Sequence, residues 1–247
     1  MRAWSLTDRG RVRKQNQDAC SFRSFLLGDG TEVTAAVVCD GMGGVAGGQI
    51  AGRLCADTVA ERILTGYRKG LSYSSVKNLL MTAIEDANTA VLTRAQTDEL
   101  PGMGTTVVAA LVEEGSAVIA HVGDSRIYRF GENEFKQLTK DHSVVQYLVD
   151  TGKITPEMAK THPDRNIITR AVGVGKYVEV QLDNTELRKG EVLLLCTDGL
   201  TGCVEDEEIS RIVRETPIEK VCETLVNAAN DAGGKDNITA VLITEGE

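Results

Sequence analysis

Alternating and continuous apolar runs at the start of the chain predict a β-hairpin followed by two helices. Residues 19–27 and 32–39 are strand-like and flank the turn residues 28–30. Beyond a glycine cluster, apolar residues recur every four positions over 51–63, which predicts an amphipathic helix. The same spacing over 76–91 predicts a second helix beside the first in the sequence.

The remainder of the chain repeats this order of grouped strands and paired helices. Strands are predicted at 105–112, 117–122, 126–130, 178–182, 192–196 and 238–244, and helices at 206–214 and 218–232. The strict strand–helix alternation of a doubly wound parallel sheet is absent. We therefore expect an α+β fold with antiparallel sheets covered by helices. No repeat or low-complexity linker divides the sequence, so we expect a single domain over residues 1–247.

One stretch interrupts the regular pattern. Residues 142–170, from His142 to Arg170, contain two short helical patterns together with Pro156 and Pro163. Proline ends or restricts helices, so this stretch is expected to be irregular. We interpret it as an inserted flap.

Composition narrows the class of protein and its partners. The 247 residues are 42% hydrophobic and 26% charged, which is typical of a soluble globular protein. The net charge of −9, from 27 Lys and Arg against 36 Asp and Glu, argues against nucleic acid or an anionic membrane as the main partner. No apolar run reaches the length of about 18 residues that spans a membrane, and the first residues do not resemble a signal peptide. The six cysteines are scattered without a Cys-x-x-Cys pair, so neither a zinc site nor a disulfide framework is expected. We expect the protein to be cytoplasmic.

Four aspartates stand where predicted strands end or begin. They are Asp40, Asp124, Asp198 and Asp236. Each alone is ordinary turn chemistry. Together, carboxylates at the ends of core strands can converge at one edge of a sheet sandwich, where they would need cations. Hard divalent ions such as Mg²⁺ and Mn²⁺ prefer oxygen ligands of this kind.

Two other motifs have competing interpretations. Residues 41–46 fit the dinucleotide fingerprint G-x-G-x-x-[GA]. However, Asp40 would repel a bound pyrophosphate, and the helix that follows leads to another helix rather than to a parallel strand. The basic run 9–14 is either a solvated loop or the source of an arginine that binds an anionic substrate.

The ordered set of motifs resembles the metal-dependent Ser/Thr protein phosphatases of the 2C type, and most closely their compact bacterial branch. The motifs that carry the resemblance are Arg13-Lys14-Gln15-Asn16-Gln17-Asp18, Asp40-Gly41-Met42-Gly43-Gly44, Gly102-Met103-Gly104-Thr105-Thr106, Gly123-Asp124-Ser125-Arg126, Thr197-Asp198-Gly199-Leu200 and Asp236-Asn237. The resemblance extends from about Ser5 to Ile243.

The resemblance implies a fold and a set of site residues. The implied fold is a four-layer α-β-β-α sandwich of two antiparallel sheets flanked by helix pairs, with a flap subdomain at 142–170 that shapes substrate access. The implied site holds two or three Mg²⁺ or Mn²⁺ ions per chain. The residues that it assigns are Asp40 as the bridge, Gly41 through its carbonyl, Asp198, Asp236, Asp18 directly or through water, Asp124 with Asp198 at a third ion, Arg13 for the substrate phosphate and Asn237 for ordering the last loop.

The implied activity is hydrolysis of phosphoserine and phosphothreonine by a water that a binuclear metal centre activates. The expected partners are phosphorylated proteins, including a bacterial Ser/Thr kinase that the enzyme opposes and the targets of that kinase. Two departures from the family pattern restrict this expectation. Gln17 replaces a glutamate that is common in relatives, and Met42 stands where animal members have a histidine that is proposed to act as the general acid.

Two alternatives remain open at this point. A catalytically silent member of the family would bind phosphoproteins without hydrolysing them, although every expected carboxylate and Arg13 are present. A metal-dependent phosphodiesterase or nuclease is the second alternative. The acidic composition and the absence of a basic stripe with interleaved aromatic residues count against it.

Overall fold

Two antiparallel β-sheets stack face to face in the centre of the computed structural model, which describes residues 1–132 and 134–245. The five-stranded sheet has the order β1 (Arg2–Asp8), β11 (Ile238–Thr244), β10 (Val192–Cys196), β7 (Arg126–Phe130) and β8 (Phe135–Gln137). The six-stranded sheet has the order β2 (Asp18–Leu26), β3 (Glu32–Met42), β5 (Val107–Glu113), β6 (Ser116–Val122) and β9 (Gln181–Glu186), and β4 (Gly104–Thr105) pairs with β3.

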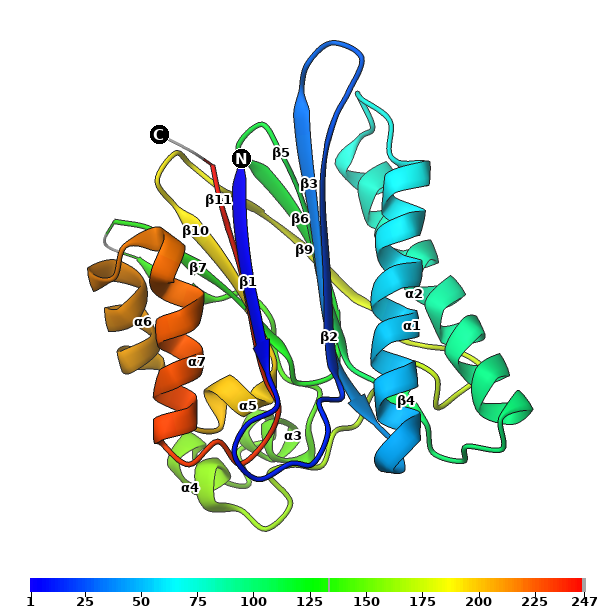
Figure 1. Cartoon of the computed structure of the whole chain (residues 1–247), viewed down its shortest axis with the longest axis vertical. Helices are drawn as coiled ribbons and strands as arrows, with labels where there is room; N and C mark the ends of the chain where they lie inside the picture. Colours follow the sequence, from blue (N-terminus) through cyan, green and yellow to red (C-terminus); the bar gives the residue numbers. More distant parts are fainter. Residues whose placement is uncertain (133, 246–247) are drawn as a thin grey trace.

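Helix pairs cover the outer face of each sheet, as Figure 1 shows. Helices α1 (Gly44–Gly66) and α2 (Tyr73–Thr97) pack against the six-stranded sheet. Helices α6 (Asp206–Glu215) and α7 (Val221–Asp231) pack against the five-stranded sheet. The expected four-layer α-β-β-α sandwich is therefore confirmed.

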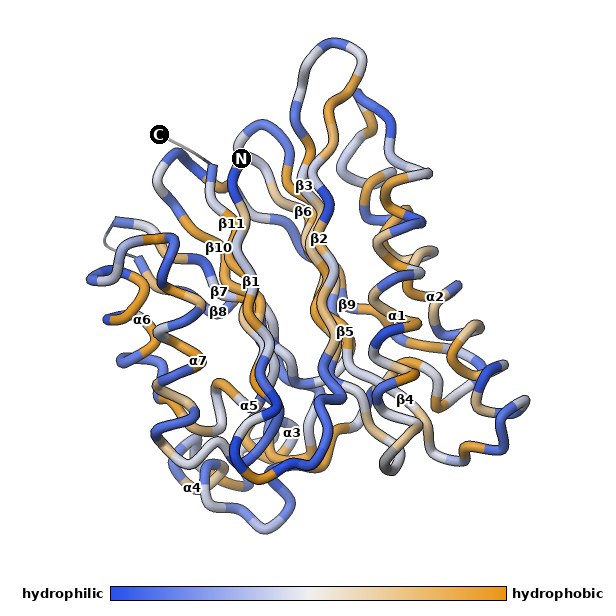
Figure 2. The backbone as a smooth tube through the Cα atoms, in the orientation of Figure 1, coloured by the Kyte–Doolittle hydropathy of each residue, from blue (hydrophilic) through white to orange (hydrophobic). Residues whose placement is uncertain are grey.

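Burial on both faces explains the continuous apolar runs of the central strands. In β10, Leu193 and Leu195 point between the two sheets, whereas Leu194 and Cys196 belong to the core under α6 and α7. A strand that is covered on both faces has no solvent side and hence no polar alternation. Figure 2 shows the same arrangement, with hydrophobic positions along the inner strands and hydrophilic positions at the loops.

The segment between β8 and β9 is irregular, as expected for the flap. It contains the short helices α3 (Val144–Asp150) and α4 (Pro156–Thr161). In Figure 1 these helices lie at the lower end of the sandwich, next to α5 (Asp198–Thr201). The expectation of one domain over residues 1–247 also includes positions 133, 246 and 247, which lie outside the described residues.

Several predicted boundaries are wrong, and long-range pairing explains two of them. The strand β1 was not predicted, and it forms by pairing with the other end of the chain, with Arg2 opposite Thr244. The strand predicted at 178–182 lies at β9 instead. This edge strand is mostly polar, and the apolar Val178 and Val180 pack beside the α1–α2 core without joining the sheet.

Three helices also differ from the predicted pattern. Helix α1 begins within the glycine cluster at Gly44 rather than at 51. The helix predicted at 218–232 divides into the 3₁₀ turn η1 (Ile218–Lys220) and α7. The predicted turn after β10 is the short helix α5. In the described part of the chain, no helix is both long and apolar enough to cross a membrane.

The central strand β10 gives a direct test of the packing. Leu194 is fully buried, so Leu194→Ala should lower the free energy of unfolding by about 2–5 kcal/mol, measured by urea denaturation. The matched control is Leu26→Ala, whose side chain is 72% exposed and should change stability by less than about 0.5 kcal/mol. Equal losses in both variants would show that the burial pattern does not control stability.

Candidate metal and phosphate site

The four strand-end aspartates line one cavity of about 540 Å³ at the end of the sandwich. They arrive from both sheets, since Asp40 is on β3, Asp124 follows β6, Asp198 follows β10, and Asp236 precedes β11. The other lining residues are Arg13, Lys14, Gln15, Gln17, Gly41, Met42, Gly43, Gly44, Thr106, Asn166, Ile168 and Asn237. The sequence prediction that these carboxylates converge is therefore correct in geometry.

The backbone of Asp40 is held from both sides by the two threonines of the Gly104-Thr105-Thr106 motif. Its carbonyl accepts hydrogen bonds from the Thr105 hydroxyl at 2.8 Å and from the Thr106 amide at 2.9 Å. Its own amide donates to the Thr106 hydroxyl at 3.0 Å. These bonds fix the point where β3 leaves the core and therefore aim the Asp40 carboxylate into the cavity.

Gly41 allows helix α1 to approach the end of β3. A Cβ atom at Gly41 would lie 1.9 Å from the carbonyl oxygen of Gly48, and one at Gly48 would lie 2.7 Å from the carbonyl oxygen of Gly41. Side chains larger than hydrogen are therefore excluded at both positions. The requirement explains the glycine cluster by backbone packing, without a dinucleotide.

Asp18 connects the two sheets behind the cavity and does not line it. It lies opposite Asp40 in the β2–β3 pair and is buried. Its Oδ2 atom accepts hydrogen bonds from the Thr239 hydroxyl at 2.7 Å, on β11 of the other sheet, and from the Thr197 hydroxyl at 2.8 Å, directly after β10. Its Oδ1 atom is buried without a hydrogen-bond partner. The sequence analysis gave no role to either threonine, although Thr197 stands in the motif Thr197-Asp198-Gly199-Leu200, because a threonine hydroxyl carries no specific signal in the sequence.

Asp198 opens helix α5, which packs directly against the start of β11. A Cβ atom at Gly199 would lie 1.8 Å from the carbonyl oxygen of Asn237. The close contact places Asp198 beside Asp236. The Oδ1 atom of Asp198 is buried without a hydrogen-bond partner.

Asn237, which lies in the loop before β11, also anchors the N-terminal loop to the cavity end of the sandwich. Its amide nitrogen Nδ2 donates to the carbonyl oxygens of Arg9 and Gln15, each at 2.9 Å, and its Oδ1 accepts from the backbone amide of Gln17 at 2.8 Å. The loop consequently brings Arg13 to the cavity, where its Nη2 donates to Asp236 Oδ2 at 2.6 Å.

The loop that carries Asp124 is fixed from two directions. A Cβ atom at Gly123, whose φ is +109°, would lie 2.6 Å from the Thr106 side chain, so the chain must be glycine there. The Ser125 hydroxyl lies 2.7 Å from that of Thr106. Next along the chain, Arg126 forms a bidentate ion pair with Asp141, with N–O distances of 2.8–3.2 Å.

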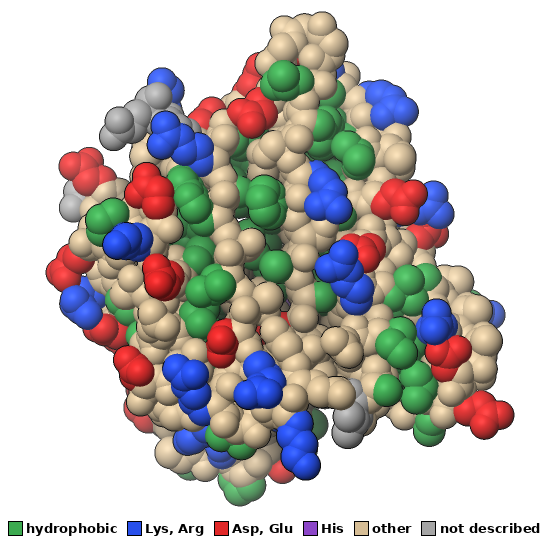
Figure 3. Space-filling model, in the orientation of Figure 1, with side chains coloured by type: hydrophobic (Ala, Val, Ile, Leu, Met, Phe, Trp, Pro, Cys, Tyr) green, Lys and Arg blue, Asp and Glu red, His purple; other side chains and the backbone are tan. Residues whose placement is uncertain are grey.

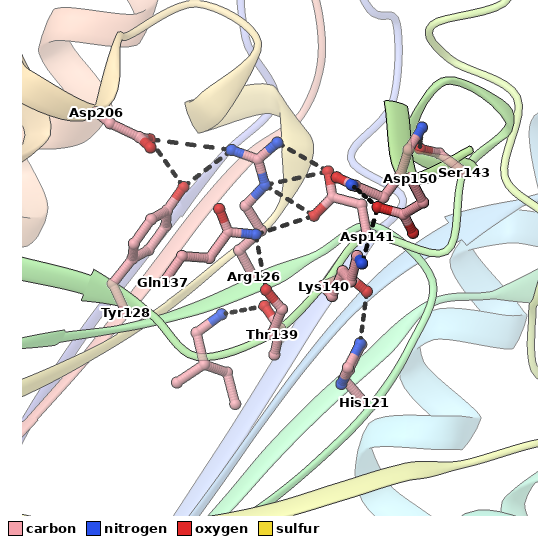
Figure 4. Close-up of polar contacts among 12 residues, drawn as sticks. His121, Arg126, Tyr128, Gln137, Thr139, Lys140, Asp141, Ser143, Asp150 and Asp206 are labelled. Carbon is pink, nitrogen blue, oxygen red and sulfur yellow. Dashed lines mark hydrogen bonds and ion pairs between the residues drawn. The ribbon is translucent and has the colours of Figure 1, made fainter. Parts of the chain in front are cut away.

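Figure 4 shows how this ion pair anchors the start of the flap. Arg126 also donates to the Tyr128 hydroxyl at 3.0 Å, which in turn donates to Asp206 at 3.0 Å. On the other side, Asp141 accepts from Gln137 at 3.2 Å. The segment leading into residue 142 is thereby held against β7.

His142 does not line the cavity. Its ring is buried and stacks on that of His121 at a centroid distance of 4.5 Å. Its Nδ1 accepts from the Gly123 amide at 3.1 Å. Burial lowers the pKa of His142 to about 4, and the neighbouring His121 and Arg170 contribute to the decrease, so the ring is neutral at physiological pH. Of residues 142–170, Asn166 and Ile168 are the ones that line the cavity.

Crowding of carboxylates dominates the electrostatics of the site. Burial raises the pKa of Asp40 well above its ordinary value, and repulsion from Asp18 and Asp198 raises it further. Burial also raises the pKa of Asp18 and of Asp124 to about 7. The pKa of Asp198 is raised by burial and by Asp236. Without cations, these acids are therefore held in an unfavourable arrangement.

The residues present fit hard divalent cations. The donor set consists of oxygen atoms, and the buried Oδ1 atoms of Asp18 and Asp198 lack partners. Among the described residues, no three His, Cys, Asp or Glu side chains are grouped so tightly that they would enclose an ion by themselves. Mg²⁺ needs no such enclosure, since it is typically held by one or two carboxylates and keeps several waters. Arg13 also occupies one oxygen of Asp236.

The raised pKa values predict how stability depends on pH when divalent cations are removed. In the folded chain Asp18 and Asp124 titrate near pH 7, whereas unfolded aspartates titrate near 3.8, so the folded state holds more protons between these values. The contribution of each group to stability is therefore present below pH 3.8 and is lost as the pH rises towards 7, by at most about 1.4 kcal/mol per pH unit for each carboxyl. The free energy of unfolding, measured by urea denaturation in EDTA at a series of pH values, should fall less steeply with rising pH in Asp18→Asn than in the natural chain. Asp183→Asn, on the exposed edge of β9, should leave the slope unchanged. Identical slopes in all three proteins would contradict the assigned shifts.

Comparison with known proteins agrees with this geometry. The sequence profile described as "Protein phosphatase 2C" matches residues 8–243. The serine/threonine phosphatase stp of Listeria innocua serovar 6a is 36% identical over an alignment 249 residues long, gaps included, that covers 98% of this chain and 95% of that protein. The crystal structure of the serine/threonine phosphatase Stp1 from Staphylococcus aureus is 40% identical with a TM-score of 0.87, and the match covers 98% of this chain and 94% of that one. The catalytic domain of the serine/threonine protein phosphatase PstP, solved in complex with 2 manganese ions, is 32% identical with a TM-score of 0.82, over 98% of this chain and 96% of that one. The chain belongs to the protein phosphatase 2C family.

Proposed function

We propose that the chain is a metal-dependent protein Ser/Thr phosphatase that hydrolyses phosphoserine and phosphothreonine in proteins. The observation that carries the proposal is the meeting of Asp40, Asp124, Asp198 and Asp236 in one cavity, with Arg13 at its edge. Carboxylates bind divalent cations, and a guanidinium binds phosphate. Membership of the 2C family and the phosphatase names of the relatives support the same activity.

The proposed ions are Mg²⁺ or Mn²⁺, which are the metals on which the family depends. Asp40, the Gly41 carbonyl, Asp198 and Asp236 would hold two of these ions. Asp124 and Asp198 would hold a third ion, giving two or three per chain. Asp18 is buried behind Asp40 and would support the site directly or through water. When bound, the ions supply activation of a water molecule and neutralisation of phosphoryl charge.

The remaining side chains define what the protein itself contributes. Arg13 presents a fork of N–H donors that matches two phosphoryl oxygens, and its side chain is 53% exposed at the cavity. Asn237 holds the loop that carries Arg13. Met42 lines the cavity but carries no proton to give to the leaving serine or threonine oxygen. The chain offers no histidine to the cavity for that step among its described residues.

The proposed partners follow from the proposed reaction. Phosphorylated proteins are the substrates, and a bacterial Ser/Thr kinase with its targets supplies them. The acidic composition disfavours nucleic acid and anionic membranes as partners. We place this activity in the cytoplasm.

Hydrolysis of a phosphothreonine peptide should require Mn²⁺ or Mg²⁺ and stop in EDTA. Asp40→Asn should lower kcat/KM by at least about 100-fold because the central cation ligand is lost. Asp183→Asn serves as the control at a remote exposed site. Turnover that persists in EDTA would contradict the proposal, and no turnover with either metal would favour a silent phosphoprotein-binding module. Faster cleavage of single-stranded DNA than of the peptide would favour a nuclease.

Arg13 should contribute mainly to binding of the phosphoryl group. Arg13→Ala is expected to weaken inhibition by inorganic phosphate about tenfold, with Arg13→Lys in between, because lysine lacks the planar fork. Arg23→Ala, on the exposed side of β2, is the control. An unchanged inhibition constant in Arg13→Ala would remove Arg13 from the phosphate site.

A further inference from the structure

Basic side chains gather beside the cavity in a chain whose net charge is −9. Figure 3 shows basic side chains at the lower end of the molecule, in the region of the N-terminal loop and of the loop before β11. Arg9, Arg11, Lys14 and Lys235 are all exposed in these two loops. We call these four residues the basic ridge. Lys14 lines the cavity itself, next to Arg13.

The backbone of the basic ridge is fixed. The amides of Arg11 and Val12 donate to the carbonyl oxygen of Gly234 at 2.8 and 3.2 Å. A Cβ atom at Gly10, whose φ is +77°, would lie 2.1 Å from the carbonyl oxygen of Asp236. The two loops are therefore packed against each other, and the backbone that carries the basic residues is held beside the cavity.

The basic ridge lacks the ion pairs that several exposed arginines elsewhere in the protein form. Within the described residues, Arg53 pairs with Asp57, Arg94 with Asp98, and Arg211 with Glu208 and Glu215. No ion pair involving a described residue is found for any member of the ridge. Unpaired positive charge therefore lies in the two loops that carry the cavity residues Arg13, Lys14 and Asp236, although the chain as a whole is acidic.

The acids closest in sequence neutralise the ridge only in part. Asp8 forms no ion pair with a ridge residue, since its Oδ1 accepts hydrogen bonds from the Gly10 amide at 2.8 Å and from Asn230 at 3.1 Å, although the charges of Arg11 and Arg9 help to lower its pKa. Asp236 adjoins Lys235 but pairs with Arg13. Asp231 is exposed at the end of α7. The four cations of the ridge outnumber Asp8 and Asp231, so the ridge keeps a positive excess.

We propose that the basic ridge binds acidic side chains that flank the phosphorylated residue of the substrate, so that the enzyme prefers phosphopeptides with Asp or Glu beside the phosphoserine or phosphothreonine. The proposal rests on the proposed phosphatase function and deepens it by naming a substrate class. Arg13 binds the phosphoryl group, and the ridge binds the acidic residues next to it.

Chemistry favours an acidic polypeptide over nucleic acid as the occupant. Binding of single-stranded nucleic acid typically combines basic groups with aromatic side chains on which bases stack. Neither residues 9–15 nor residues 232–237 contain an aromatic residue. Exposed charges act over a Debye length of about 8 Å at physiological salt, so the ridge can attract only groups close to the phosphate.

The test compares two phosphothreonine peptides of equal length, one with Glu on both sides of the phosphothreonine and one with Gln at the same positions. The Glu peptide should have a KM about three- to tenfold lower at 0.15 M NaCl, with a similar kcat, and the difference should shrink at 0.5 M NaCl. Fluorescence anisotropy of labelled, unphosphorylated versions of both peptides, measured in parallel, reports their binding to the ridge independently of hydrolysis.

Neutralising the ridge should abolish this preference. The triple variant Arg9→Gln, Arg11→Gln, Lys235→Gln leaves Lys14 and Arg13 in place. It should hydrolyse the Gln peptide as the natural chain does and lose the lower KM for the Glu peptide. The matched control is Arg2→Gln, Arg23→Gln, Lys189→Gln, which removes the same charges from exposed positions outside the cavity lining and should keep the preference.

The outcomes separate failure of this proposal from failure of the proposed function. Equal KM values for the two peptides, or equal loss of preference in both triple variants, would overturn the proposal that the ridge binds acidic flanking residues, without affecting the proposed phosphatase function. If neither peptide is hydrolysed, the phosphatase proposal fails. In that case, weaker binding of the Glu peptide by the ridge variant but not by the control variant, measured by anisotropy, would still support the binding of acidic side chains by the ridge. Binding of a single-stranded oligonucleotide or of phosphatidylglycerol vesicles by the ridge, without discrimination between the peptides, would overturn it.

Discussion

Mutual repulsion among partly buried aspartates is the constraint on which the rest of the structure depends. Asp40, Asp124 and Asp198 come from different strand ends, and burial together with neighbouring carboxylates raises the pKa of each. A fold gains nothing in stability from placing such groups together, because unpaired buried charge is costly. The arrangement is consistent with a function that supplies positive charge, from divalent cations and from Arg13.

The surrounding contacts hold these groups in place against that repulsion. Hydroxyl groups from one sheet reach a buried acid of the other, as Thr197 and Thr239 do at Asp18. Glycines allow backbones to approach within distances that a Cβ would prevent, most clearly at Gly41 and Gly199. Rigid strands thus fix the positions of the cavity carboxylates, while loops on the same edge provide the basic groups that would contact the substrate.

The sequence predicted the fold class and the acidic cluster better than it predicted boundaries. Periodicity identified the buried strands and the paired helices because those segments are strongly apolar. It missed β1, because that strand is defined by pairing with the far end of the chain, and misplaced β9, because an edge strand need not be apolar. At the site, the motifs identified the carboxylates, but the hydroxyl partners of Asp18 and the buried position of His142 depend on packing that no local pattern records.

The central claim is that the cavity carboxylates are arranged for cations. The most direct measurement is calorimetric titration of the EDTA-treated, dialysed protein with Mn²⁺, combined with the midpoint of thermal unfolding at each metal concentration. The account predicts at least two bound ions per chain and a midpoint that rises with Mn²⁺, because ligands that bind the folded state stabilise it. It also predicts that Asp40→Asn loses both effects. Absence of Mn²⁺ binding, or binding that leaves the unfolding midpoint unchanged and survives Asp40→Asn, would contradict it.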